Sequence, residues 1–243
     1  MHLRLAGLRG RLAAGARALT TASSGGGGGS GGGGGDAAVR ALLDRALTKV
    51  DEHGWTQRAV AAAADEAGLP GMAYGFGRPV DLVGHFMDRA LDTTCCEAED
   101  QLHEPDSAAD KLRLLCRIRL RQTRPLLRRW PEAAALLAQP QNVPLAMRHL
   151  DALSSQLWYL AGDASTRGDW YLKRSALAAA YVASELYMCE DRSPDARATW
   201  DFLDRRIADV QAAVDAGEAT AAFGGQFGRN LFNILASHGY VPR

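Results

Sequence analysis

From Asp36 onward, hydrophobic positions recur every three or four residues, and no stretch shows the strict alternation of a half-buried β-strand. This spacing gathers the hydrophobic side chains of each segment on one face of an α-helix. The pattern predicts an all-α fold, with helices over about 36–52, 57–67, 79–103, 107–128 and 130–138, followed by helices that begin after Pro144, at Asp169 and at Ser193.

Several predicted helix ends are marked by glycine, proline or threonine. Gly54 follows the first helix at a position where C-terminal glycines are common, and Thr56 can cap the second helix. The second helix is expected to end at Gly68, and Pro79 is expected to start the third. Pro125 lacks a backbone N–H and should bend or reset the fourth helix.

The helix that begins at Asp169 is predicted to be a central packing element. Asp169 stands at the N-cap position, and Trp170 and Tyr171 follow in the first turn, where a partner can reach them. Further along, small side chains let another helix approach closely: Ala176, Ala178, Ala179, Ala180, Ala183 and Ser184.

Two neighbouring helices carry hydrophobic stripes at helical spacing. The first stripe consists of Leu150, Leu153, Leu157 and Leu160. The second consists of Trp200, Leu203, Ile207, Val210 and Val214. The second stripe suits pairing with the small-residue helix or with its own copy in a second subunit.

The two ends of the chain differ from this body. Residues 1–24 carry four arginines and no acid, which is typical of a mitochondrial transit peptide; a secretory signal or a chloroplast address is the alternative. Residues 25–35 are almost entirely glycine and predict a flexible linker.

Residues 217–243 combine a glycine-bearing hinge with an amphipathic helix. Its large apolar side chains share one face: Phe223, Phe227, Leu231, Ile234 and Leu235. Such a helix can lie in a membrane interface, or it can dock on the protein's own core. The spacing alone leaves both interpretations open.

The charge balance argues against a nucleic-acid-binding protein. The chain has 28 basic and 28 acidic residues; without the four N-terminal arginines, 24 basic residues remain against 28 acidic, a net charge of −4. A stripe at helical spacing consists of Arg117, Arg121, Arg124 and Arg128. This stripe can meet anionic phospholipids, but a solvated face paired with neighbouring acids is the favoured interpretation.

Neither catalysis nor a metal centre is predicted. Nucleotide-binding, zinc-protease and serine-hydrolase motifs are absent, and the six histidines are scattered. The four cysteines lack metal-ligand spacing and are interpreted as buried, reduced thiols. We expect no cofactor, and a binding protein fits the sequence better than an enzyme.

Residues 40–87 contain a helix, HGW at 53–55, an alanine-rich helix, AGL at 67–69 and an aromatic–glycine pattern before the next helix. This order resembles the N-terminal helix-turn-helix domain of TetR-type regulators. The segment in place of the recognition helix, residues 70–76, is apolar and glycine-bearing. Because reading bases and phosphates needs Arg, Lys, Asn or Gln, DNA binding is expected to be lost.

Residues 129–207 carry distinctive motifs in order: WP at 130–131, QNVP at 141–144, LWYLAGDAST at 157–166, DWYLKR at 169–174, and DRSPD followed by TWDFLDRRI ending at Ile207. They closely resemble the mitochondrial accessory lipid-binding protein family of ubiquinone (coenzyme Q) biosynthesis, which has a TetR-like fold. The resemblance covers about residues 38–215.

The resemblance implies a homodimer with a helix-turn-helix-like domain at 36–80, a larger helical lipid-binding and dimerisation bundle at 81–216, and a membrane-interacting helix within 217–243. It implies a non-enzymatic, peripheral protein on the matrix side of the mitochondrial inner membrane. Such a protein binds isoprenoid quinone precursors and phospholipids, and presents the precursors to the demethoxyubiquinone hydroxylase of the biosynthesis complex. A TetR-like, small-molecule-responsive transcription regulator is the alternative.

The resemblance also suggests site residues. The family's docking pair matches Trp170 and Tyr171, while the family's acidic residue falls on Arg167; Asp169 is expected to take its place. The walls of the lipid pocket are expected to come from Leu150, Leu153, Leu157, Tyr181 and Leu186.

Overall fold

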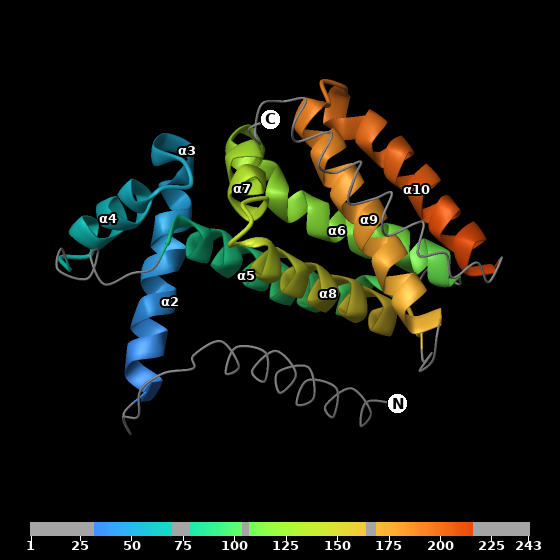
Figure 1. The fold of residues 1–243 in the computed structure, drawn as a ribbon, viewed down its shortest axis with the longest axis horizontal. Coiled ribbons are helices and arrows are strands. Elements are labelled where there is room, and N and C mark those ends of the chain that lie inside the picture. Colours follow the sequence, from blue (N-terminus) through green and yellow to red (C-terminus); the bar gives the residue numbers. More distant parts are fainter. Residues whose placement is uncertain (1–31, 70–77, 104–106, 164–168, 216–243) are drawn as a thin grey trace. The chain divides into compact units, whose positions relative to one another are not determined.

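The computed structural model describes residues 32–69, 78–103, 107–163 and 169–215. The chain divides into two compact units, residues 1–40 and 41–243. In the first unit, the described residues form the N-terminal part of helix α2 (Gly32–Thr48). Every regular element of the described residues is helical, so the all-α prediction is confirmed for them (Figure 1).

The first predicted helix is divided in two. α2 begins at Gly32, inside the stretch predicted to be linker, and the chain turns at Lys49 before the short helix α3 (Val50–His53). Gly54 then adopts a φ of 68°, as its predicted place after the helix requires. Thr56 caps α4 (Gln57–Glu66) by accepting a hydrogen bond from the backbone N–H of Arg58, at 3.2 Å, which confirms the predicted cap.

Proline sets the ends of the middle helices. α5 (Pro79–Gln101) begins at its proline, as predicted. α6 (Ala108–Thr123) ends before the predicted residue 128, because Pro125 cannot donate to the α-helical ladder. Residues Arg124–Arg129 form the 3₁₀ helix η2 instead, and α7 (Trp130–Leu137) follows where predicted.

The C-terminal helices are α8 (Val143–Leu160), α9 (Asp169–Glu190) and α10 (Arg197–Asp215), with the 3₁₀ turn η3 (Pro194–Ala196) before α10. α9 packs against both α8 and α10, and α6 contacts α5, α8 and α10 (Figure 1). Leu203, Ile207 and Val210 of α10 are buried. The stripe of α10 therefore pairs with the small-residue helix, which is the first of the two predicted alternatives.

The described residues of the second unit bury two hydrophobic clusters. The N-terminal core lies among α2–α5 and α7, and includes Leu42, Val50, Trp55, Ala63, Val83, Phe86 and Trp130. The C-terminal core lies among α6 and α8–α10, and includes Leu115, Ile118, Leu153, Leu157, Leu177, Tyr181 and Ile207. α5 contributes Phe86 to the first and Ala98 to the second. The boundary expected at residue 80 thus falls within the first turn of a 23-residue helix that contributes to both cores.

Candidate functional site

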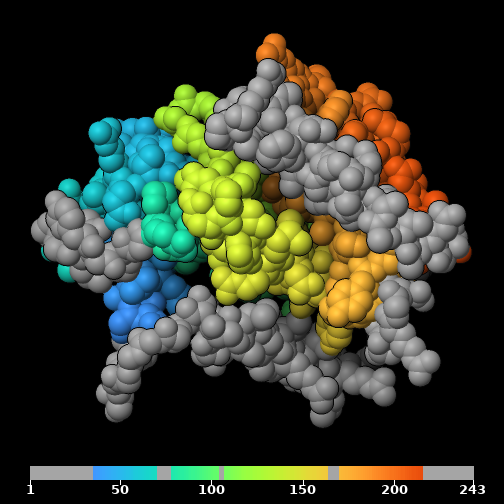
Figure 2. All heavy atoms as spheres, viewed as in Figure 1, coloured from blue at the N-terminus to red at the C-terminus, as the bar shows by residue number. Residues whose placement is uncertain are grey.

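The predicted docking pair lies at the surface, in the first turn of α9. Tyr171 is 75% exposed and Trp170 is half-buried, with the two rings edge to face and their centroids 4.6 Å apart. On the face seen in Figure 2, the start of α9 is exposed beside α8. Asp169 is the first residue of α9, but its side chain lies outside the described part of the structure. The structure thus places the aromatic pair where a partner can reach it.

One arginine holds Trp170 against α8. The guanidinium carbon of Arg174 lies 3.8 Å from the centroid of the Trp170 ring. Its Nε donates to Ser155 Oγ on α8 at 2.8 Å, and its Nη1 donates to the carbonyl of Trp170 at 3.3 Å. Sequence reasoning missed this contact, although the i, i+4 spacing of Trp170 and Arg174 could have indicated it.

A largely covered ion pair joins the end of α8 to the first turns of α9. Lys173 Nζ lies 2.7 Å from Asp163 Oδ1, with both side chains largely covered. The indole N–H of Trp158 donates to the carbonyl of Lys173 at 2.8 Å, and Lys173 Nζ lies 5.4 Å from the Trp158 ring centroid. These contacts join the end of α8 to the beginning of α9 below the exposed pair.

The five predicted pocket residues all belong to the C-terminal helices, but they differ in burial. Leu153, Leu157 and Tyr181 are buried in the C-terminal core, whereas Leu150 packs at its margin and Leu186 is half-buried. A cavity of about 180 Å³ is lined by another set: Ala108, Trp158, Ala161, Gly162, Asp163, Lys173, Gln211 and Val214. Contact of the five predicted residues with a lipid stays a prediction.

A buried polar cluster lies where the two cores meet. Glu185 Oε1 accepts hydrogen bonds from the hydroxyls of Tyr181, at 2.8 Å, and Thr123, at 3.3 Å. Arg119, 2% exposed, donates to Thr123 Oγ1, and its guanidinium lies 5.4 Å from the ring centroid of Phe86 and 5.7 Å from that of Tyr181. The Arg119–Tyr181–Glu185 cluster therefore ties α5, α6 and α9 together.

Burial decides the ionisation of this cluster. It raises the pKa of Glu185, although the nearby Arg119 charge and the hydrogen bonds that the carboxylate accepts act in the opposite direction. Burial likewise raises the pKa of the Tyr181 hydroxyl well above its ordinary value. The sequence offered one signal for this cluster, the lone acid Glu185 within an otherwise apolar stretch of α9.

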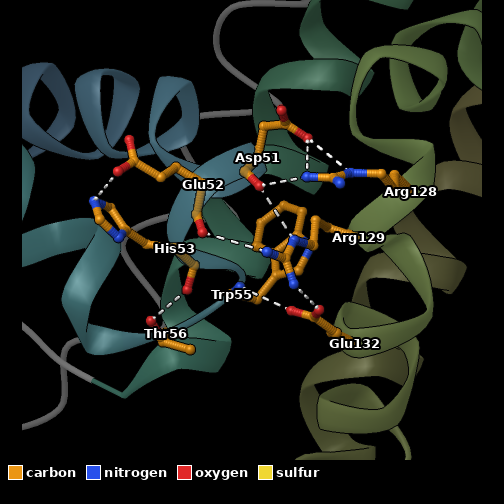
Figure 3. A network of polar contacts seen from close by, with 8 residues as sticks. All are labelled: Asp51, Glu52, His53, Trp55, Thr56, Arg128, Arg129 and Glu132. Carbon is orange, nitrogen blue, oxygen red and sulfur yellow. Dashed lines mark hydrogen bonds and ion pairs between the residues drawn. The ribbon is translucent and has the colours of Figure 1, made fainter.

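A second polar network joins α3 to η2 and α7 (Figure 3). Arg129 donates to the carbonyls of Asp51 and Glu52, at 3.2 and 3.3 Å, and so satisfies acceptors at the C-terminal end of α3. It also pairs with Glu132 at 2.7 Å, and the other oxygen of Glu132 accepts from the backbone N–H of Trp55 at 3.4 Å. This α3–η2 network covers the buried Trp55, whose ring meets those of Phe86 and Trp130 edge to face.

Most arginines of the basic stripe pair with acids, as the favoured interpretation predicts. The break at Thr123 divides it between α6 and η2. Three of its members contact acids, Arg117 with Asp204, Arg124 with Asp195 and Arg128 with Asp51. These arginines therefore join helices to one another across a solvated face.

The four cysteines are all free thiols. Cys116 is buried, Cys95 and Cys189 are half-buried, and burial raises the pKa of each of these three thiols to about 12. Cys96 is exposed, so the prediction of burial is wrong there, because its position on α5 faces away from both cores.

Several predictions fall outside the described residues. They are the transit peptide at 1–24, the segment in place of a recognition helix at 70–76, and the terminal membrane helix with Phe223, Phe227, Leu231, Ile234 and Leu235. Among the residues that are described, no group of side chains could hold a metal ion. None of the described helices has both the length and the apolar character needed to cross a bilayer.

Known proteins resemble the part of this chain that carries the aromatic pair. A family model described as COQ9 matches residues 143–214, which run from α8 to α10 and include Trp170 and Tyr171. The chain is also 36% identical over 178 residues to the mitochondrial ubiquinone biosynthesis protein COQ9 of Homo sapiens, covering 70% of this chain and 56% of that protein. This chain belongs to the COQ9 family.

Other members of the COQ9 family match to the same extent. The COQ9 protein of Rattus norvegicus is 37% identical over 178 residues, which cover 70% of this chain and 57% of that protein. A probable ubiquinone biosynthesis protein of Dictyostelium discoideum is 35% identical over 178 residues, which cover 70% of this chain and 58% of that protein. The match thus spans little more than half the length of these relatives.

Proposed function

We propose that this protein is a non-enzymatic accessory protein of ubiquinone biosynthesis. It binds isoprenoid quinone intermediates and phospholipids and presents the quinone intermediates to the demethoxyubiquinone hydroxylase. It acts as a homodimer at the matrix side of the mitochondrial inner membrane, in a TetR-like arrangement of helices. The names of its relatives, which place them in mitochondria and in ubiquinone biosynthesis, support this assignment.

The observation that carries the proposal is the exposure of the aromatic pair within the family's matched segment. A tyrosine that leaves 75% of its surface in water, edge to face with a half-buried tryptophan, is a preferred anchor for a protein partner. Arg174 and the Lys173–Asp163 pair hold the turn that carries it. We assign the hydroxylase to this surface.

The lipid part of the proposal rests on the C-terminal helices. A polyprenyl tail is too apolar to leave a bilayer unaided, so a carrier must offer it an apolar interior. Leu150, Leu153 and Leu157 lie on α8, and Tyr181 and Leu186 lie on α9, the helix that also carries the docking pair. In the proposed mechanism the terminal helix dips into the bilayer and passes the tail to these helices, which raises the local concentration of the head group near a docked enzyme.

The docking role is tested with a double substitution, Trp170→Ala with Tyr171→Ala. We expect the variant to retain less hydroxylase in a pull-down while its thermal unfolding changes little, because Tyr171 is exposed and Trp170 is only half-buried outside both cores. Tyr187→Ala is the matched control: it removes another exposed tyrosine from α9, about 24 Å further along the helix. Equal retention of hydroxylase by the double variant and the wild type would refute the docking assignment.

The lipid role is tested by native mass spectrometry of the purified protein. We expect co-purifying isoprenoid quinones or phospholipids. A gel-shift assay on mixed genomic fragments tests the alternative of a TetR-like regulator; a specific shifted fragment, with no lipid bound, would favour that alternative. Turnover of a quinone intermediate by the purified chain without added hydroxylase would contradict the non-enzymatic role.

A further inference from the structure

We propose that Arg174 is a positioning residue of the docking surface, which sets the orientation of the Trp170 ring before the partner arrives. The inference rests on the proposed docking function and names a residue that acts through Trp170 instead of touching the partner. It follows from a group of contacts that converge on one guanidinium at the junction of α8 and α9.

The guanidinium is held from two helices at once. Its Nε donates to Ser155 Oγ of α8 at 2.8 Å, while its Nη1 donates to the carbonyl of Trp170 on α9 at 3.3 Å. A planar guanidinium group held by two hydrogen bonds has little freedom to rotate. The plane of the Arg174 guanidinium is therefore fixed relative to both α8 and α9.

The Trp170 ring rests on that fixed guanidinium. The guanidinium carbon lies 3.8 Å from the ring centroid, well within the distance of a cation–π contact. Trp170 is only half-buried, so core packing alone does not hold the ring. The Tyr171 ring meets it edge to face, and so takes its own position partly from Trp170.

Such pre-ordering matters for binding. An interface gains affinity when a side chain is already ordered in the free protein, because less rotamer entropy is lost on association. Lysine cannot replace arginine in this role, since an ammonium group neither stacks flat on an indole nor offers a rigid fork. Arg174→Lys therefore keeps the charge and removes the positioning.

The partner-independent test uses the full-length protein labelled with 5-fluorotryptophan, whose five tryptophans give five fluorine resonances. Trp170→Phe identifies the Trp170 resonance by its loss. We expect Arg174→Lys, and to a lesser degree Ser155→Ala, to shift or broaden that resonance and to leave the other four in place. An unchanged Trp170 resonance in Arg174→Lys would overturn the proposal.

The binding test measures hydroxylase affinity in a double-mutant cycle. We expect Arg174→Lys to weaken binding about three- to tenfold in the wild-type background, as the loss of a cation–π contact would. In the Trp170→Ala background the same change should have no further effect, since nothing remains to be positioned. Additive losses would overturn the proposal by showing that Arg174 contacts the partner itself.

The two tests separate the failure of this inference from the failure of the proposed function. If Trp170→Ala does not weaken hydroxylase binding, the docking function fails, and the Trp170 resonance still decides whether Arg174 orients the ring. If Trp170→Ala weakens binding but Arg174→Lys leaves both affinity and resonance unchanged, the docking function stands and the positioning role falls.

Discussion

Replacing Gly54 by alanine should destabilise the protein more than an ordinary glycine substitution. Gly54 follows α3 with φ 68° and ψ −171°, a region of backbone space that is essentially restricted to glycine. A Cβ atom at this position would also lie 2.5 Å from Glu132 Oε2. The substitution therefore strains the backbone and displaces a carboxylate of the α3–η2 network (Figure 3).

The size of the effect follows from these two contributions. Holding alanine in this backbone conformation costs about 1–3 kcal/mol. The Glu132 side chain can swing away from the new methyl group, but it then loses its bonds to Arg129 and to the backbone N–H of Trp55. The pair with Arg129 is partly exposed, so these losses together add about 1 kcal/mol. We expect a total of about 2–4 kcal/mol.

Urea unfolding followed by far-ultraviolet circular dichroism measures this loss. The matched control is Gly68→Ala, because Gly68 also has a positive φ, 69°, but a Cβ there would meet nothing within 4 Å. We expect the control to lose about 1–2 kcal/mol, the ordinary penalty of the left-handed region. Equal losses in the two variants would refute the role of Glu132. A second check is Glu132→Ala, in whose background Gly54→Ala should cost less than in the wild type.

Two further predictions concern ionisation and membrane attachment. Burial raises the pKa of Glu185, so the folded protein retains this proton to a higher pH than the unfolded chain does. The contribution of this group to the free energy of unfolding is therefore complete below the unfolded pKa. It is lost as the pH rises through the folded pKa. Glu185→Gln should flatten that decline in urea unfolding as the pH rises above 4.5, the ordinary pKa of a glutamate, and parallel pH profiles would contradict it. Deleting residues 222–243 should abolish liposome flotation while leaving the helical circular dichroism nearly intact, and unchanged flotation would exclude the membrane role.

Local signals in the sequence were enough to predict most helix ends. Thr56, Pro79 and Trp130 begin or precede helices where expected, and Gly54 and Gly68 follow helices with positive φ. These positions are decided within a few residues, by a missing N–H or a side-chain cap, and so they can be recognised without tertiary information. The error at α6 has the same origin: the sequence predicts that Pro125 bends or resets the helix, whereas the α-helix ends at Thr123 and a 3₁₀ helix follows.

The exposed pair of the candidate site was also within reach of sequence reasoning, because helical spacing places Trp170 and Tyr171 in the first turn of α9. The contacts behind the pair were not. Arg174 meets Ser155, which is 19 positions away in the chain, and Glu185 meets Thr123 across 62 positions. Such partners depend on how α6, α8 and α9 pack. Periodicity likewise places Leu157 and Tyr181 on inward faces without distinguishing a filled core from a lipid-lined wall.

Helices α3 and α5 are held to the rest of the described chain by contacts that a freely moving DNA reader would have to break. α5 is one continuous helix that enters both cores, and the Arg119 guanidinium lies between Phe86 of one core and Tyr181 of the other. Moving α3 away from η2 would also separate Arg129 from the carbonyls at the end of α3 and uncover Trp55. Each of these movements would expose a buried ring or leave a polar group without its hydrogen-bond partner. Leaving one buried polar group unpaired costs about 1–3 kcal/mol of stability. These contacts argue against a freely moving DNA reader, and they agree with the proposed lipid-presenting function, which needs no contact with DNA.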